Sequence, residues 1–283
     1  MNIRTYGTDE RLAFCREYLY KKNIRSVRDI ILLPIPTSKD GLTVFSTGKT
    51  PEELFGAVGC SDALGARGEG LVFGESTDAG NEENPDELPL FSSLVVGYGL
   101  PTGFRRFFSE RGSCIADVAN DENFVSENAR LTAEGTLGKI LSEEKAAPSE
   151  LSVGIIGYGR IGKRLLNLLA FLGARLTVFT SKEELVRELC MIGVSSAPSE
   201  SLSNGTAVKA LGELDIIINT APTRLIGDAE LSALSGAKII ELASGNNFPD
   251  GTSVLRLPSL PARMYPKSAG KVLADSVLRM LGE

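Results

Sequence analysis

The segment at residues 153–165 reads "VGIIGYGRIGKRL" and predicts a strand, a glycine-rich turn and a helix in succession. Its first residues are an apolar run typical of a buried strand, and the residues after the glycines continue as an amphipathic helix. Between strand and helix, Gly157, Gly159 and Gly162 form the pattern G-x-G-x-x-G. A strand before the pattern and a helix after it are the context that distinguishes a dinucleotide-binding turn from a chance match.

Each glycine of this turn meets a separate need. Gly157 permits the tight turn, Gly159 lets the backbone approach a pyrophosphate, and Gly162 lets the helix pack on the strand. The helix start adds free N–H groups and a partial positive charge. A glycine-rich turn without a ligand is the alternative, but three glycines in one such unit lower stability unless the space is used. The predicted cofactor-binding residues of the turn are Gly157, Tyr158, Gly159, Arg160, Ile161 and Gly162.

The end of the next strand indicates which dinucleotide binds. Residues 176–185 read "LTVFTSKEEL". An NAD enzyme keeps an acid near this point for the ribose hydroxyls. Here Thr180, Ser181 and Lys182 take that place, and hydroxyls with a cation suit a 2′-phosphate. We therefore predict NADP rather than NAD, although Glu183 and Glu184 follow directly and a shifted register would present an acid.

Two further apolar strands, "LDIIINTAP" at 214–222 and "AKIIELAS" at 237–244, follow in the second half. Strands that alternate with helices imply right-handed crossovers and a parallel sheet. Ligands bind at the carboxyl edge of such a sheet. We predict cofactor contacts at the ends of these strands, near the nicotinamide and its ribose, from Asn219, Thr220, Ala221, Pro222, Ala243 and Ser244. A simple strand-ending turn at 219–220 is the other interpretation.

The first half holds shorter α/β units. Strands are expected at 2–7, 28–36, 42–47, 70–75 and 113–118, and an acidic loop at 75–89. Helices are expected at 9–22 and at 50–58, the second with Thr50 as N-cap. The fold class is α/β, with two Rossmann-like domains that contain parallel sheets. We place a flavodoxin-like or Rossmann-like substrate domain at 1–127, to which a C-terminal helix at 268–283 returns, and an NADP-binding domain at 128–267 that begins with a linking helix at 128–147.

Composition narrows the function classes. The 283 residues are 42% apolar with a net charge of −6, and their cations form no stripe for a phosphate backbone, so we expect no nucleic-acid partner. No apolar run reaches about 18 residues and the start is polar, so we expect no membrane span and a cytoplasmic location. The four cysteines, at 15, 60, 114 and 190, lack metal or redox spacing, so we expect no metal site. The chain has no histidine, which excludes Ser-His-Asp hydrolysis, His-ligated zinc and His-based hydride chemistry.

Motifs along the whole chain point to one family. The segments "DIILLPIPTSKDG", "NARLTAEGTLGKIL", "GYGRIGKRL", "DIIINTAP", "IIELAS" and "LPSLPARMYPKSAGKVLAD" occur in order. In order and spacing the chain resembles the family of dipicolinate synthase A subunits, from near its first residue to near its last. The most specific segments are "TAEG" at 132–135 and "PKSAGKVLAD" at 266–275. The second is similar to the family's Pro-Lys-Thr-Ala-Gly, with Ser268 in place of Thr.

The resemblance implies an NADP-dependent oxidoreductase that converts dihydrodipicolinate to dipicolinate during spore formation. It also implies a partner, a separate flavoprotein-like B subunit, and we expect a homo-oligomer. A dicarboxylate substrate needs fixed donors, and we predict that Thr37, Ser38, Thr132, Lys267 and Ser268 supply them. Glu134 is the sixth predicted substrate residue. Lys267 and Ser268 are also the predicted catalytic residues. Other interpretations are a solvated helix start for Lys267 and a capping acid for Glu134.

Two other functions remain open at the level of sequence. A D-2-hydroxyacid dehydrogenase shares the two-domain plan, but such enzymes rely on a His–carboxylate pair that this chain lacks. A nucleotide-binding sensor or interaction protein without catalysis is the second alternative. It is kept because residues 130–131 and 245–251 depart from the family's pattern.

Overall fold

The computed structural model describes residues 2–22, 24, 29–45, 47–55, 93–245, 247–249 and 251–282. The chain divides into two compact units, one formed by residues 1–125 and 266–283 and the other by residues 126–265. The division falls inside helix α4 (Glu122–Glu143), which begins before the predicted start at 128. The strand expected at 70–75, the loop expected at 75–89 and the end of the helix expected at 50–58 lie outside the described residues.

The first unit contains a parallel sheet of four described strands. They are β1 (Asn2–Thr5), β2 (Asp29–Leu32), β3 (Ser93–Gly97) and β4 (Cys114–Asp117), in the spatial order β1-β2-β3-β4. Both β2 and β3 are almost wholly buried. A parallel strand covered on both faces reads as a continuous apolar run, which is why "IILL" at 30–33 marks β2 so clearly.

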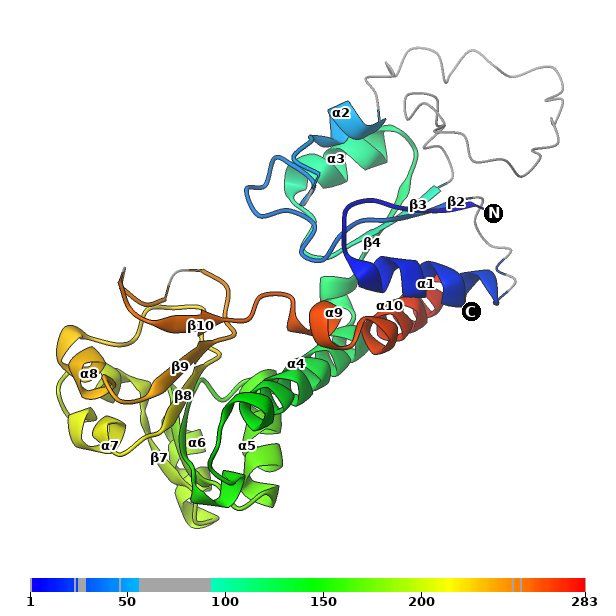
Figure 1. Cartoon of the computed structure of the whole chain (residues 1–283). Coiled ribbons are helices and arrows are strands. Elements are labelled where there is room, and N and C mark those ends of the chain that lie inside the picture. Colours follow the sequence, from blue (N-terminus) through cyan, green and yellow to red (C-terminus); the bar gives the residue numbers. More distant parts are fainter. Residues whose placement is uncertain are drawn as a thin grey trace, which may run out of the picture. The chain divides into compact units, whose positions relative to one another are not determined.

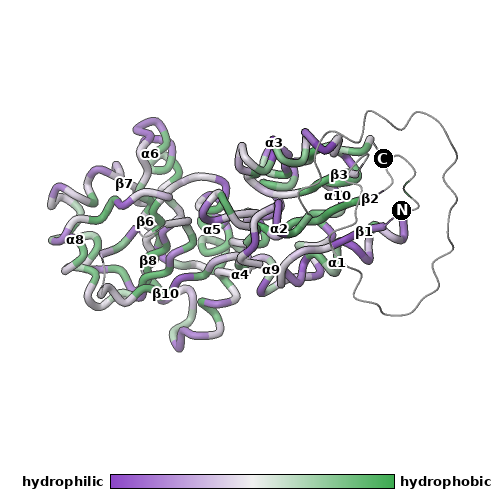
Figure 2. Tube along the Cα trace, turned by 90° about the horizontal axis from the view of Figure 1, so that it is seen from above, coloured by the Kyte–Doolittle hydropathy of each residue, from purple (hydrophilic) through white to green (hydrophobic). Residues whose placement is uncertain are grey.

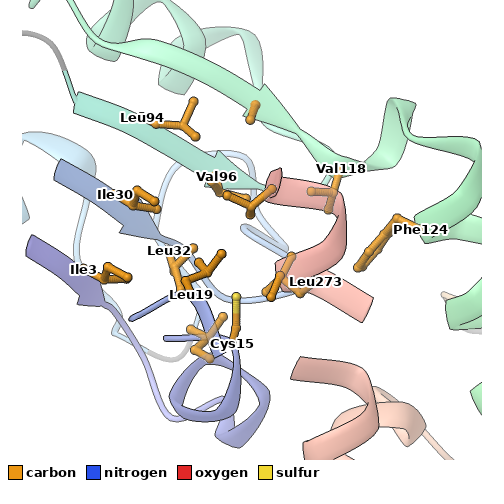
Figure 3. Close-up of a cluster of buried hydrophobic side chains, with 14 of the residues drawn as sticks. Ile3, Cys15, Leu19, Ile30, Leu32, Leu94, Val96, Val118, Phe124 and Leu273 are labelled. Atoms are coloured by element: carbon orange, nitrogen blue, oxygen red, sulfur yellow. The ribbon is translucent and has the colours of Figure 1, made fainter. Parts of the chain in front are cut away.

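Helices cover both faces of this sheet. On one face, α1 (Glu10–Tyr20) and α10 (Pro266–Leu281) pack on the strands, and their side chains meet those of β1, β2 and β3 in one apolar cluster. Figure 3 shows Cys15, Leu19 and Leu273 pointing into this cluster beside Ile30, Leu32 and Val96. On the other face, α2 (Pro51–Phe55) and α3 (Thr102–Glu110) bury Phe55, Phe107 and Phe108. The C-terminal helix thus returns to the N-terminal unit, as predicted.

The second unit contains a parallel sheet of six described strands. They are β5 (Ser152–Ile156), β6 (Arg175–Thr180), β7 (Ser195–Pro198), β8 (Ile216–Asn219), β9 (Lys238–Glu241) and β10 (Val254–Arg256). Their spatial order is β10-β9-β8-β5-β6-β7. The chain therefore reverses its direction of winding at β5, where ligands bind in doubly wound sheets.

Two layers of helices enclose this second sheet (Figure 1). One layer consists of α4, α5 (Arg160–Phe171), α6 (Glu183–Met191) and the short α9 (Leu260–Met264). The other contains α7 (Val208–Gly212) and α8 (Asp228–Ala233). Figure 2 shows the hydrophobic residues concentrated in the strands of both units. In the described part of the chain, no helix has both the length and the apolar character that a membrane crossing requires.

The predicted fold class is confirmed by two parallel sheets with helices on both faces. The N-cap at Thr50 is also confirmed, because its Oγ1 accepts the Glu53 N–H while Glu53 accepts the Thr50 N–H. The strand expected at 42–47 is wrong: among its described residues only Val44 makes a β-bridge, to Lys49. Sequence patterns missed the strands β3, β7 and β10 and the helices α3, α7, α8 and α9.

Candidate functional site

The glycine turn lies at the carboxyl edge of the second sheet, between β5 and α5. Gly157 has a φ of +91°, a left-handed conformation that side chains disfavour. A Cβ on Gly162 would lie 2.1 Å from the Gly157 carbonyl oxygen, so only glycine allows α5 to approach the strand this closely. A Cβ on Gly159 would meet nothing within 4 Å. Gly157 and Gly162 are thus required by the backbone turn and by the packing of α5, whereas Gly159 borders open space.

That open space adjoins the start of α5. Gly159 is the N-cap of the helix, and among the described residues no side chain caps it. The first turn of a helix carries N–H groups without intrahelical partners and a partial positive charge. A dinucleotide diphosphate supplies the acceptor oxygens and the negative charge that this helix start lacks. The residues present therefore fit the cofactor that the sequence predicts.

A hydrogen-bonded bridge joins the glycine turn to the end of β8. The Thr220 hydroxyl lies 2.9 Å from the carbonyl oxygen of Ile156 and 3.2 Å from that of Gly157. The Thr220 N–H also donates to Ile156 O. A Cβ on Gly157 would lie 2.6 Å from the Thr220 hydroxyl. Two segments predicted to contact the cofactor are therefore held together by direct contacts. The Thr220 hydroxyl is used in bonds to the protein backbone.

The three residues predicted to recognise a 2′-phosphate differ in exposure. Ser181 and Lys182 are exposed just before α6, where a ligand can reach them. Thr180 is only 4% exposed, and its Oγ1 accepts the Lys182 N–H at 3.4 Å. Glu183, the first residue of α6, forms an ion pair with Arg187. The acid that follows Lys182 is therefore already partnered by a cation.

A buried acid that the sequence analysis missed lies beside this edge. Glu241, the last residue of β9, is 3% exposed, and Asn219, the last residue of β8, is 2% exposed. Glu241 Oε1 accepts the Asn219 side-chain N–H at 2.9 Å and the Ala243 backbone N–H at 3.0 Å. A glutamate that directly follows two buried isoleucines in the strand "KIIE" was the available signal, because charged residues are seldom buried without a partner.

The predicted substrate residues of the first unit lie in the loop after β2. Thr37 is fully buried, and its Oγ1 accepts the Tyr98 N–H at 2.7 Å. Ser38 is partly exposed, and its hydroxyl lies 3.0 Å from Asp40 Oδ1. Asp40 also accepts N–H groups of Leu42 and Thr43, and these bonds hold the pKa of its carboxyl far below the usual range. This loop is ordered by its own side chains.

Lys267 and Ser268, the predicted catalytic residues, are exposed in the first turn of α10. The charge of Lys267 adds to the lowering of the Glu17 pKa, which is due mainly to a hydrogen bond from Lys21. Gly270, in the same helix, allows α10 to approach α1 closely, because a Cβ on it would lie 2.6 Å from Arg11 O and from Phe14 Cβ. The motif around Lys267 therefore combines two exposed polar residues with a close helix–helix contact.

The other two predicted substrate residues belong to the second unit, on α4. Thr132 is 7% exposed and its hydroxyl donates to Asn128 O at 2.8 Å. Glu134 lies in the middle of the helix and accepts a hydrogen bond from Arg130 at 2.7 Å. The glycine of "TAEG" serves packing, since a Cβ on Gly135 would lie 3.0 Å from the Leu260 side chain. The six predicted substrate residues are thus divided between the two units.

Two other features could mark a site among the described residues, a hollow in the second unit or a group of metal-binding side chains. A hollow of about 880 Å³ lies along β6, β7 and α7, and none of the predicted cofactor residues lines it. In the same part of the chain, no cluster of three or more His, Cys, Asp or Glu side chains is arranged to hold a metal ion. The glycine turn and the buried ends of β8 and β9 remain the best-defined site.

Known proteins resemble this chain in sequence and in fold. Over 234 residues the chain is 27% identical to the A subunit of dipicolinate synthase from Bacillus subtilis (strain 168), covering 76% of this chain and 74% of that protein. The crystal structure of the dipicolinate synthase A subunit from Bacillus halodurans superposes with a TM-score of 0.71, at 18% identity, over 100% of this chain and 98% of that one.

A more distant likeness concerns the fold alone. The structure of an L-alanine dehydrogenase matches with a TM-score of 0.52 at 14% identity, over 99% of this chain and 88% of that one. No family model matches the chain. The comparisons confirm the resemblance predicted from the sequence motifs, and they show a dehydrogenase-type fold.

Proposed function

We propose that this chain, which belongs to the family of dipicolinate synthase A subunits, is an NADP-dependent oxidoreductase that converts dihydrodipicolinate to dipicolinate. The observation that carries the proposal is the glycine turn, where an uncapped helix start adjoins open space over Gly159. Dipicolinate formation for spores and a cytoplasmic location belong to the same proposal.

The choice of NADP rests on the residues after β6. Lys182 and Ser181 are exposed beside the start of α6, and the neighbouring Glu183 is paired with Arg187. A cation and a hydroxyl stabilise a phosphate through charge-assisted hydrogen bonds. The 2′-phosphate therefore meets a favourable local charge. Glu183, the first residue of α6 and a candidate acceptor for the ribose hydroxyls of NAD, is already paired with Arg187.

The bound dinucleotide supplies the acceptor for the hydride. The chain's own residues then have to hold two substrate carboxylates and exclude water. Lys267, with the N–H groups at the start of α10, offers one donor set for a carboxylate. Ser38 in the first unit and Thr132 in the second unit are further hydroxyl donors, each within its own unit. The lack of histidine suits a reaction whose aromatic product drives it, because a strong general base is then less necessary.

Two partners are part of the proposal. The Bacillus subtilis relative is named as one lettered component of its synthase, which supports the existence of another component. We propose a flavoprotein-like B subunit that works with this chain. We also propose a homo-oligomer. The substrate is a small dicarboxylate; neither nucleic acid nor membrane is proposed as a partner.

The test is hydride transfer by the purified chain. NADP and freshly made dihydrodipicolinate are mixed with the protein, with and without the B partner, and absorbance of the reduced nicotinamide is followed. We expect absorbance to rise as dipicolinate forms. Dinucleotide binding without any hydride transfer in either mixture would contradict the enzyme and favour the sensor.

A variant at Lys182 tests the cofactor choice separately. Lys182→Ala should weaken NADP binding by about tenfold, the loss of one charge-assisted contact, and leave NAD binding unchanged. Lys209→Ala, an exposed lysine of α7, is the matched control and should change neither affinity. Tighter binding of NAD than of NADP by the unaltered chain would contradict the proposal.

A further inference from the structure

Glu241 is a buried acid for which the mechanism above has no use. Its Oε1 atom has two donors, the Asn219 amide and the Ala243 N–H. Its Oε2 atom is buried and has no hydrogen-bond partner among the described residues. A buried polar atom without a partner costs free energy, so an acid at this position calls for a physical reason.

The neighbours of Glu241 connect it to the cofactor edge. Asn219 Oδ1 accepts the Ala221 N–H at 3.1 Å, and Asn219 Nδ2 donates to Ala221 O at 3.1 Å as well as to Glu241. One amide therefore closes the turn after β8 while it bonds the acid at the end of β9. Through Ala243 the same acid fixes the first residues after β9.

We propose that Glu241 is a positioning residue of the dinucleotide site, whose carboxyl group ties the turn after β8 to the turn after β9. The inference rests on the proposed function, because these two turns hold the residues predicted to flank the nicotinamide and its ribose. Glu241 itself touches no ligand: it acts through Asn219 and Ala243.

The surroundings of the carboxyl group agree with this role. Burial raises the pKa of Glu241, and the opposing influences are the Ala243 N–H, the Asn247 and Asn219 side chains and the charge of Arg256 on β10. Oε1 accepts the N–H groups of Asn219 and Ala243 as an amide carbonyl oxygen would. A neutral glutamine reproduces that arrangement, and an alanine does not.

The experiment compares two ligands on the full-length chain. NADP carries the nicotinamide half, whereas 2′,5′-ADP lacks it and uses only the glycine turn and the residues after β6. If the chain prefers NAD, then NAD and ADP take their places. Affinities are measured by calorimetry for the unaltered chain, Glu241→Ala and Glu241→Gln. If Glu241→Ala does not fold, Glu241→Asp, which withdraws the carboxyl by one methylene, replaces it.

We expect Glu241→Ala to weaken NADP binding by about tenfold, as the loss of a buried acceptor predicts, with 2′,5′-ADP binding unchanged. Glu241→Gln should restore the NADP affinity. Equal weakening of both ligands, unchanged NADP binding, or a glutamine variant as weak as alanine would overturn the inference. An unaltered chain that binds neither ligand would instead overturn the proposed function.

Glu230 provides the matched control. It is another buried acid of the second unit, 2% exposed, and its Oε1 accepts the Gly205 N–H. Glu230→Ala should lower the melting temperature without any selective loss of NADP over 2′,5′-ADP. The same selective loss in this variant would contradict a specific role for Glu241.

Discussion

The carboxyl edges of the two parallel sheets differ in what satisfies their backbone N–H groups. In the first unit, Asp117 at the end of β4 accepts the N–H groups of Gly99, Leu100 and Ala119 at 2.8–3.0 Å. Asp117 also pairs with Arg105. In the second unit, α5 starts without a side-chain cap beside Gly159. One edge is filled by the chain's own carboxylate, and the other leaves N–H groups for a ligand.

This difference shows that the parallel fold alone does not make a dinucleotide site. Both sheets put strand ends and turns along one edge, but residue types decide whether that edge is closed. In the first unit a Cβ on Gly97 would lie 2.6 Å from the Thr37 hydroxyl, so glycine there allows a protein side chain to approach. In the second unit Gly159 borders space that no described side chain fills.

The largest effect is expected at the glycines of the second edge. Gly162→Ala places a Cβ against the Gly157 carbonyl, and overpacking of this kind costs about 3 kcal/mol. We expect a lower free energy of unfolding in urea and loss of NADP binding. A variant that is as stable as the unaltered chain and binds NADP normally would contradict the close packing assigned to Gly162.

Gly159→Ala is the matched control for that variant. Its Cβ meets no protein atom, so the free energy of unfolding should stay within about 0.5 kcal/mol. NADP should nevertheless bind more weakly, because the methyl group occupies the space offered to the diphosphate. Unchanged NADP affinity in this variant would mean that the ligand does not approach Gly159.

A smaller effect, on stability alone, is expected at the first edge. Asp117→Asn keeps the shape of the side chain but removes the charge that receives three N–H groups and Arg105. The free energy of unfolding should fall by about 2 kcal/mol, and NADP affinity should not change. Glu110→Gln, which alters an exposed pair with Arg106, should cost less than about 1 kcal/mol. Loss of NADP binding in Asp117→Asn would mean that the first edge is not closed as described.

The smallest expected effect is on the pH dependence of stability, to which Asp121 and Glu241 contribute in opposite directions. Burial acts to raise the pKa of Asp121, but hydrogen bonds from Ser276 and Arg279 outweigh it and hold that pKa below its usual value. Its stabilisation is therefore complete above about pH 4 and is lost as the pH falls further. The pKa of Glu241 is raised by burial, so its contribution is largest below about pH 4 and falls as the pH rises.

Hydrogen exchange measured by mass spectrometry, corrected for the intrinsic rate at each pH, reports on the two units separately. Asp121→Asn should flatten the loss of protection in α10 at acid pH, and Glu241→Gln should flatten the loss in β9 as pH rises. Protection that changes in the opposite direction in either element would contradict the contacts assigned to that acid.

Sequence patterns predicted the start of the second unit, from β5 to α6, more completely than the rest of the chain, for a physical reason. Its strands alternate with amphipathic helices, and three glycines mark the turn, so local residue types carry the information. In the first unit, β3 reads "SLVVG" and was missed, and the strand predicted from "LTVFST" is wrong. A short apolar run has no periodicity that separates a strand from a loop, and long-range pairing with β2 and β4 decides it.

The site shows the same limit. The glycine turn was predictable because backbone conformation demands glycine there, and Ser181 and Lys182 are exposed as a ligand requires. The segment "KIIE" contains a signal for a buried Glu241, but its pairing with Asn219 was not predictable, since it joins residues on two strands that only the fold brings together. Thr37 was predicted as a substrate residue, and the structure shows its hydroxyl bonded to the Tyr98 N–H, a contact between distant segments that local patterns do not reveal.

The most direct test of the central claim is a crystal structure of the chain soaked with NADP. We expect the diphosphate beside the N–H groups of residues 160–162, above Gly159, with the 2′-phosphate next to Ser181 and Lys182. Density for the dinucleotide at another place, or a glycine turn that stays empty at saturating NADP, would contradict the account.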